Sequence, residues 1–220
     1  MGLRPLKLLV LLLLLLVGPS QAWASSERLE ERLGQWPSWS LPAPLERPGQ
    51  RDLIYPSWFA GAWIATSHDL SEREPDLSYP VRFQISAGGE VVGDRAFNAR
   101  SVGEALLGPQ LLQVRNDPRN PNRQLADLRD DQQLESTVTG RRSEQPGPDI
   151  FLADELSLQV LHGPGDPRVS QVETLNRYRR VSPDRIEAEQ WQVSYGSPSE
   201  GLMAKGTRSW HGTLRLERQS

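Results

Sequence analysis

Residues 79–90 read YPVRFQISAGGE and predict an antiparallel β-hairpin. Val81, Phe83 and Ile85 alternate with polar residues, which is the period of two that places apolar side chains on one face of a strand. Two glycines follow at residues 88–89, and glycine readily adopts the positive φ that tight hairpin turns require. This stretch therefore indicates a strand that reverses direction, and not a helix.

Similar short runs fill most of the chain after its first quarter. They are residues 58–70, 90–99, 111–117, 124–130, 133–142, 151–161, 170–181, 185–195 and 208–218. Turn-forming residues separate them, notably GPGDP at 163–167 and SPD at 182–184. Residues 101–109 suggest one or two helical turns. About ten strands at this spacing, without a long helical pattern, predict an antiparallel all-β domain.

The faces of the last strands mix polar and aromatic residues. In the run 185–195, Glu187, Glu189, Trp191 and Tyr195 share one face. Such faces favour a closed barrel with a partly polar lumen over a sandwich with an apolar core. Closure also removes open strand edges. We therefore predict a single up-and-down β-barrel over residues 57–220.

The N-terminus has the parts of a secretory signal peptide. Arg4 and Lys7 make its start basic, residues 8–18 form an apolar run, and residues 22–24 provide a small-x-small exit. The apolar run is short for a bilayer span, which takes ~20 residues. We therefore predict a signal peptide over residues 1–24, export of the mature chain, and no transmembrane span after cleavage.

Residues 25–56 predict a short helix followed by an extended arm. Leu29 and Leu33 are four apart in the helical stretch 26–33 and share a face. Five prolines then follow, and they rule out a helix or a central strand. The arm carries Trp36 and Trp39, so we expect it to pack either on the domain or on a partner.

Composition excludes several classes of function. The chain has 25 Lys and Arg against 28 Asp and Glu, a net charge of −3. It therefore does not predict a nucleic-acid partner, which requires a basic face. The absence of cysteine excludes a thiolate nucleophile and any Cys-ligated metal or iron–sulfur site.

Further motifs for metal, phosphate or cofactor binding are not evident. His68, His162 and His211 lack the short spacing of a local metal site. The Gly-x-Ser-x-Gly motif of serine hydrolases and glycine-rich phosphate loops are both missing. No catalytic residue, metal site or cofactor is therefore assigned from motifs.

Residues 61–63 read GAW, at the start of the first long strand. This Gly-x-Trp resembles the lipocalin-like (calycin) superfamily. The resemblance implies that Gly61 and Trp63 are structural, with the indole at the closed end of a barrel under an arginine of the last strand. Arg208 and Arg215 are the candidates for that arginine.

A second resemblance covers almost the whole mature chain. It rests on RPGQRDLIYPSWFAGAW, GDRAFNAR, RNPNRQLA, QLESTVTGRR, FLADELSLQVLHGPGDPRVSQVETLNRYRR and EAEQW. These stretches resemble an uncharacterised family of exported proteins in cyanobacteria and chloroplasts. The resemblance implies a photosynthetic organism and a location in the thylakoid lumen or periplasm. It implies no activity and no functional residues.

Carboxylate pairs are the main candidates for chemistry. Glu187 and Glu189 share a face, and Asp154 and Glu155 are adjacent in a strand. A carboxylate whose pKa is raised by burial can act as an acid or base. Three arginines at 177, 179 and 180 lie on the preceding strand, however, and cross-strand pairing with them would satisfy these carboxylates structurally.

Aromatic and acidic residues could line a pocket for one small ligand. The candidates are Phe83, Phe97, Tyr178, Glu187, Glu189, Trp191 and Tyr195. The aromatic members could equally fill a core. We expect a non-catalytic binding protein for a small amphipathic molecule, such as a pigment, lipid or tetrapyrrole.

Two alternatives stay open. One is a non-catalytic assembly or interaction factor for a photosynthetic (thylakoid) membrane complex, with residues 35–56 as its docking element. The other is an isoprenoid-modifying enzyme with Glu187 or Glu189 as its acid–base group.

Overall fold

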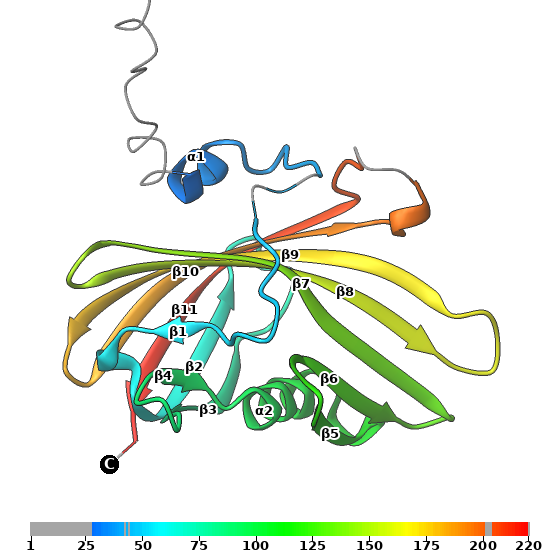
Figure 1. The fold of residues 1–220 in the computed structure, drawn as a ribbon, viewed down its shortest axis with the longest axis horizontal. Helices are drawn as coiled ribbons and strands as arrows, with labels where there is room; N and C mark the ends of the chain where they lie inside the picture. Colours follow the sequence, from blue (N-terminus) through cyan, green and yellow to red (C-terminus); the bar gives the residue numbers. More distant parts are fainter. Residues whose placement is uncertain (1–27, 42, 44, 201–203, 220) are drawn as a thin grey trace, which may run out of the picture.

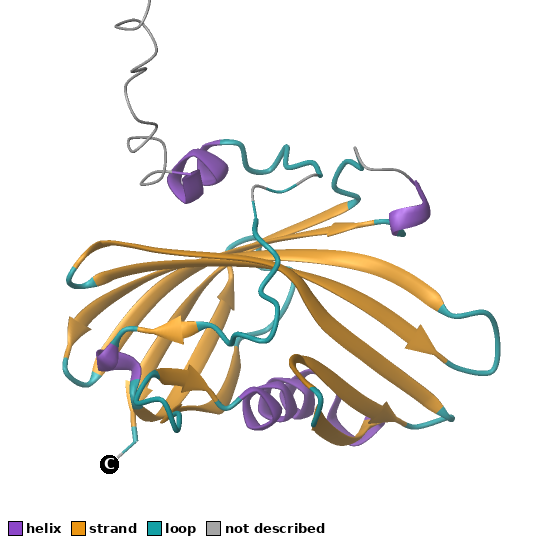
Figure 2. Ribbon diagram, viewed as in Figure 1, coloured by secondary structure: helices purple, strands orange, loops and turns teal. Residues whose placement is uncertain are grey.

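The computed structural model describes residues 28–41, 43, 45–200 and 204–219 (Figure 2). The predicted signal peptide, residues 1–24, lies outside these ranges. The described elements are α1 (Arg28–Gly34), β1 (Ile54–Tyr55), η1 (Ser57–Phe59), β2 (Gly61–Asp69), β3 (Leu77–Ile85), β4 (Val91–Gly93), α2 (Arg95–Leu107), η2 (Gly108–Gln110), β5 (Leu111–Asp117), β6 (Asn120–Leu128), β7 (Gln132–Gly147), β8 (Ile150–His162), β9 (Arg168–Ser182), β10 (Arg185–Tyr195), η3 (Pro198–Glu200) and β11 (Arg208–Arg218). Within these ranges, neither α-helix has the length and apolar character that a membrane crossing demands.

The strands form one antiparallel sheet in the order β1-β4-β3-β2-β11-β10-β9-β8-β7-β6-β5. Strands β5 to β11 follow one another in space as in sequence, and β11 then pairs with β2, the first long strand. The all-β, up-and-down prediction is therefore confirmed. The sheet curls into a half-barrel whose edges are β1 and β5 (Figure 1). Helix α2 follows β4 and leads through η2 into β5, and it packs against β3 and β5.

One predicted strand was wrong. The run 90–99 is a strand only as far as Gly93, after which α2 begins. The side chain of Asp94 accepts a hydrogen bond from the backbone N–H of Phe97 at 3.3 Å, which is the arrangement of an N-cap. The alternation in residues 90–99 did not reveal this cap, and the helix extends well beyond the one or two turns expected.

The sheet buries apolar residues on both faces. The concave face holds one core around Phe59 and Trp63, with Phe83, Phe151, Tyr178 and Ile186 among its members. The convex face holds a second core: Leu29, Trp39, Leu41, Leu152, Leu175, Trp191, Val193 and Tyr195. Helix α1 and the arm lie over this second core (Figure 1). The arm therefore packs on the domain, which was one of its two expected locations.

Backbone hydrogen bonds also hold the arm. Leu41 N–H donates to Ala204 O at 2.8 Å, in the connection between β10 and β11. Further along, Glu46 and Arg141 exchange N–H···O bonds of 3.1 and 2.7 Å. Strand β6 pairs with β7 only from Gln132 to Thr137, so the arm bridges β7 beyond the end of β6. It thereby protects an edge that would otherwise be open.

Candidate functional site

Trp63 and Arg218 form the base of the half-barrel. Trp63 is fully buried, and its indole N–H donates to Phe59 O at 2.7 Å. The Arg218 guanidinium lies 4.1 Å from the centre of the Trp63 ring and donates to Ala60 O at 2.8 Å. Gly61 has a φ of +121°, and a Cβ there would come within 2.7 Å of Arg218 Nη1. This end therefore has the tryptophan–arginine stack that the Gly-x-Trp resemblance implied.

The arginine in that stack is not one of the two predicted. Arg218 is the register partner of Trp63, whereas Arg215 is the partner of Thr66 on the other face of β2. Arg208 lies near the opposite end of β11, where its Nη2 is 3.3 Å from Glu74 Oε1. The last strand has the bounds predicted for it, and its final arginine, Arg218, takes the structural position.

Aromatic rings pack closely in the concave core. Phe59 lies at the centre, with ring centroids of Phe83 at 4.9 Å and Tyr178 at 5.0 Å. Tyr55 lies 4.8 Å from Phe83, and Phe151 lies 6.2 Å from Tyr178. Burial raises the pKa of the Tyr178 hydroxyl well above its ordinary value. Two of the seven ligand-binding candidates, Phe83 and Tyr178, therefore lie among other core rings.

The other five candidates lie in three further places. Phe97 is on α2, with the Arg82 guanidinium 4.4 Å from its ring centre. Trp191 and Tyr195 are buried on the convex face beneath α1 and the arm. Glu187 and Glu189 line a depression on the outer surface. The structure therefore does not bring the seven residues into one pocket.

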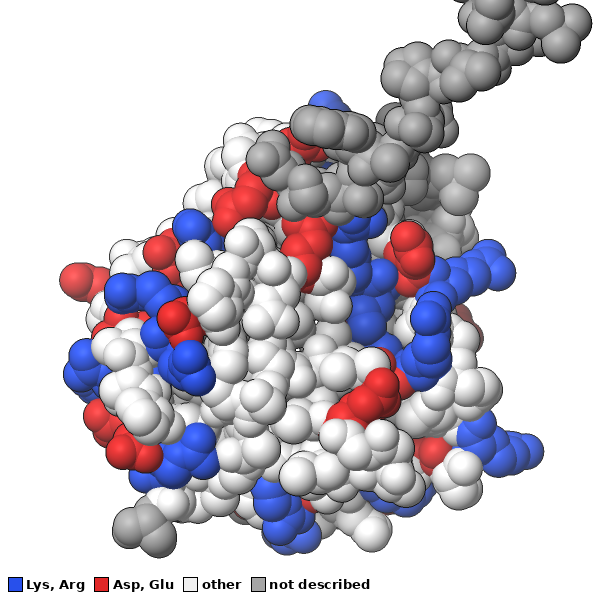
Figure 3. All heavy atoms as spheres, turned by 60° about the vertical axis from the view of Figure 1, so that its left-hand side comes forward, with Lys and Arg blue, Asp and Glu red and all other residues white. Residues whose placement is uncertain are grey.

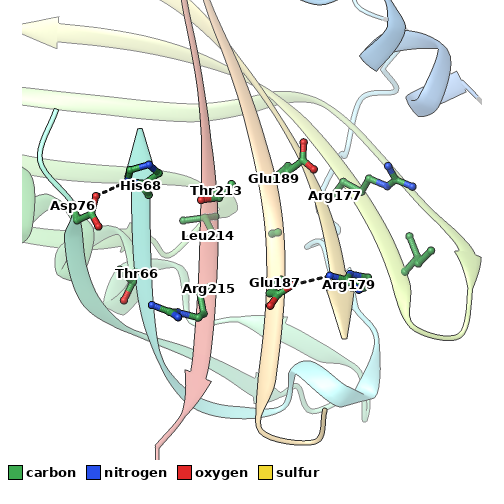
Figure 4. A pocket seen from close by; sticks show the side chains of 12 residues that line it. Thr66, His68, Asp76, Arg177, Arg179, Glu187, Glu189, Thr213, Leu214 and Arg215 are labelled. Carbon is green, nitrogen blue, oxygen red and sulfur yellow. Dashed lines mark hydrogen bonds and ion pairs between the residues drawn. The ribbon is translucent and has the colours of Figure 1, made fainter. Parts of the chain in front are cut away.

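The outer depression has a volume of about 620 Å³ and crosses β9, β10, β11 and β2 (Figure 4). Because paired strands align their side chains, two rows cross it. One row is Thr66, Arg215, Glu187 and Arg179, and the other is His68, Thr213, Glu189 and Arg177. Ile150 adds an apolar side chain, and Ala188 and Leu214, whose side chains face the concave core, complete the lining.

Most charges in the depression are paired. Glu187 Oε2 accepts a hydrogen bond from Arg179 at 2.7 Å, as the cross-strand interpretation predicted. Arg177 is the register partner of Glu189, but its ion pair is with Glu30 of α1, 3.5 Å away. His68 Nδ1 is 2.7 Å from Asp76 Oδ1, and this hydrogen bond raises the pKa of the imidazole.

Arg215 differs from the other arginines of the depression. It forms no ion pair or hydrogen bond with any residue in the described part of the chain. In Figure 4 its side chain points toward Thr66 on β2 and away from Glu187. Arg215 and the hydroxyls of Thr66 and Thr213 therefore form a group of hydrogen-bond donors beside a paired network.

A second polar cluster was missed by sequence reasoning. Glu155 Oε1 accepts hydrogen bonds from Arg141 at 2.7 Å and from Arg95 at 2.8 Å. Arg95 also donates to Asp52 at 2.7 Å, and Arg141 donates to Asn122 at 2.6 Å. Two carboxylates and two guanidiniums therefore neutralise one another where the arm, α2, β6, β7 and β8 meet.

A signal for this cluster was present in the sequence. Five of the stretches that carry the resemblance to exported proteins, at 47–63, 93–100, 119–126, 133–142 and 151–180, each supply one member. The residues are more than 10 positions apart along the chain, so spacing could not bring them together. The only indication of the cluster in the sequence was that each of these five separate stretches contains one of its polar residues.

A third cluster lies beneath α1. Arg32 donates to both carboxylate oxygens of Glu173, at 2.7 and 2.6 Å. The Tyr195 hydroxyl donates to Glu173 at 2.5 Å. Asp154 is buried beside them, and neither of its carboxylate oxygens has a hydrogen-bond partner in the described structure. Burial, and then the charge of Glu173, raise the pKa of Asp154 well above its ordinary value.

The face of the molecule shown in Figure 3 has no large patch of one charge sign. On the face shown in Figure 3, acidic and basic side chains are interspersed around a broad uncharged centre. Across the described residues, no group of three or more His, Asp or Glu is arranged to hold a metal ion.

Comparison with known proteins adds a family assignment. Residues 47–209, about three quarters of the chain, match the family described as a domain of unknown function, DUF6816. No curated protein and no solved structure matches the chain. Because the match covers well over half of the sequence, the chain belongs to the DUF6816 family.

Proposed function

We propose that this protein is a non-catalytic binding protein that holds a small amphipathic molecule in the outer depression. The observation that carries the proposal is the unpaired Arg215 beside two hydroxyls in a depression of about 620 Å³. A volume of this order suits one small ligand. The concave core is occupied by packed rings, so the proposal locates the ligand on the convex face and not in a lumen.

The chemistry of the depression favours one anionic group on the ligand. A guanidinium binds a carboxylate or phosphate through two parallel hydrogen bonds, and Arg215 has its donors available. Thr66 is the register partner of Arg215 on β2, and Thr213 lies two residues before Arg215 on the same face of β11. Glu187, Glu189 and Asp76 also line the depression and would repel a ligand with several negative charges.

The apolar part of the ligand would lie over Ile150 and over the strands at Ala188 and Leu214, whose own side chains face the concave core. A fatty acid, or a pigment or tetrapyrrole with a single free carboxylate, combines these features. We further propose that the protein is exported and works in the periplasm or thylakoid lumen, on the basis of residues 1–24.

Calorimetric titration of the mature chain tests the proposal. The probes are decanoate, decanol and decyltrimethylammonium, each below its critical micelle concentration. We expect decanoate to bind most tightly, and its affinity to fall about tenfold in Arg215→Gln because a charge-assisted pair is lost. Arg168→Gln, an exposed arginine on β9 outside the depression, is the matched control and should bind like wild type. Equal affinity of wild type and Arg215→Gln, or no binding of decanoate, would reject this site.

A second candidate is an interaction factor for a membrane complex. The arm is a poor docking element because Trp39 is buried against the domain. Leu106, Leu107 and Leu112 are about half exposed where α2 leads into β5, and β5 is an edge of the sheet. An open edge beside apolar side chains can accept a partner strand. Leu112→Glu should abolish co-purification of the partner, whereas Leu70→Glu, an equally exposed leucine elsewhere, should retain it.

A further inference from the structure

We propose that α1 and the arm dock on the convex face together with one proton held by Asp154, so that the arm is bound more tightly in acid than in base. The arm would then be a pH-dependent cover over the second core of the sheet.

The position of Asp154 is the first reason. Its side chain is 0% exposed, and neither oxygen receives a hydrogen bond from a described residue. An ionised carboxylate in this place would lose its water and gain no donor in return, which disfavours the charged form. A protonated carboxyl has no such cost, and it can donate its proton to a neighbouring carboxylate.

The charges around Asp154 are the second reason. Arg32 faces it from α1, but both hydrogen bonds from that guanidinium to a carboxylate go to Glu173 on β9. The hydroxyl facing it from β10, that of Tyr195, also donates to Glu173. Asp154 is therefore a further carboxyl group beside an ion pair that is already neutral.

The neighbouring strand β7 does not change this balance. Arg142 is the register partner of Asp154, and its Nε donates to Glu144 at 2.7 Å. Glu155 also contributes a negative charge, but it points to the other face, where Arg95 and Arg141 bind it. The groups that face Asp154 therefore favour its neutral form.

Docking of the arm creates this environment. Leu29 and Trp39 are buried in the same core, and Arg32 is 4% exposed. If α1 and the arm leave, water reaches Asp154, which then ionises at its ordinary pKa of about 4. The docked form thus holds one proton more than the undocked form over a range of pH.

The direction of the effect follows from this difference. The contribution of Asp154 to docking is largest below a pH of about 4, where this carboxyl is protonated in both forms. As the pH rises above that value, the docking constant falls about tenfold per unit, until Asp154 ionises in the docked form too. The raised pKa of the buried Asp154 carboxyl extends this range upward.

Hydrogen exchange of the mature chain tests the inference. The readout is the protection of backbone amides in residues 28–41 between pH 5.5 and 8.5, corrected for intrinsic exchange and compared with β9. We expect wild-type protection of the arm to fall by about tenfold or more over this range, while β9 changes less. Asp154→Asn is permanently neutral and should keep the arm protected throughout.

Asp149→Asn is the matched control because Asp149 is an exposed residue next to β8 that pairs with Arg180. It should behave like wild type. Wild-type protection of the arm that does not change with pH would overturn the inference. A pH dependence that persists in Asp154→Asn would also overturn it, because the dependence would then belong to another group, such as His211 beside Trp36. If that variant does not fold, carboxyl ¹³C NMR of the wild-type chain decides: an Asp154 resonance that titrates near pH 4 contradicts the proposal.

Discussion

Asp154 and Glu155 are neighbours in β8, yet they lie on opposite faces of the sheet and in opposite electrostatic settings. Asp154 lies beneath α1 and receives no hydrogen bond from the residues that the structure describes. Glu155 receives hydrogen bonds from Arg95 and Arg141. Burial alone would raise the pKa of Glu155, but the two guanidiniums hold it below its ordinary value. Folding thus shifts the pKa values of two adjacent carboxyl groups in opposite directions.

Replacing Glu155 by Gln should destabilise the domain by about 3 kcal/mol, because two guanidiniums then lack their shared carboxylate. Urea unfolding followed by tryptophan fluorescence measures the change. Glu187→Gln removes the surface pair with Arg179 and should cost less than about 1 kcal/mol. Equal losses in the two variants would show that the inner cluster contributes no more than a surface pair.

The same cluster should make the domain sensitive to acid. Since the pKa of Glu155 is lowered by folding, its contribution is complete above the unfolded-state value of about 4.3 and is lost as the pH falls below it. Urea midpoints of the wild type between pH 2.5 and 7 should therefore fall more steeply in acid than those of Glu155→Gln. Parallel curves for the two proteins would contradict this assignment.

Arg218→Ala should destabilise the domain by about 2–3 kcal/mol. The variant loses the stack on Trp63 and hydrogen bonds to the carbonyls of Ala60 and Trp58. Arg215→Ala, on the same strand but exposed, should change stability by no more than about 0.5 kcal/mol. Thermal or urea unfolding of both variants measures which arginine supports the base of the half-barrel.

Gly212→Ala should cost about 2 kcal/mol. A Cβ at this position would overlap the Trp210 ring and would come within 2.6 Å of the backbone O of His68. The backbone atom cannot move away without disturbing the pairing of β2 with β11. Gly147→Ala is the control because a Cβ there meets nothing within 4 Å. A stable Gly212→Ala protein would mean that this pairing tolerates a shift.

Alternation of polar and apolar residues was sufficient to predict most of the strands. The hairpin that opens after Ile85 is present, and Gly89 has a φ of +82° in its turn. The turns at 163–167 and 182–184 also separate β8, β9 and β10. These features are local, so the sequence specifies them directly.

The candidate pocket could not be predicted, because the buried face changes along a single strand. In β10, Ile186 and Ala188 are buried on the concave side, whereas Trp191, Val193 and Tyr195 are buried on the convex side. The arm causes this change by covering only one end of the strand. The prediction treated the residues on one face of the strand as a single group, although they lie in separate environments.

The pairing of β2 with β11 also determines when the sheet can be completed during synthesis. Trp63 and Arg218 are joined across almost the whole domain, and contacts between such distant residues form slowly. A nascent chain that stops before residue 208 leaves the long strands β2 and β10 without the neighbour that lies between them. The fold therefore closes only after β11 has been synthesised and has left the ribosome, and until then the chain stays open to chaperones and to any translocation machinery that accepts unfolded polypeptide.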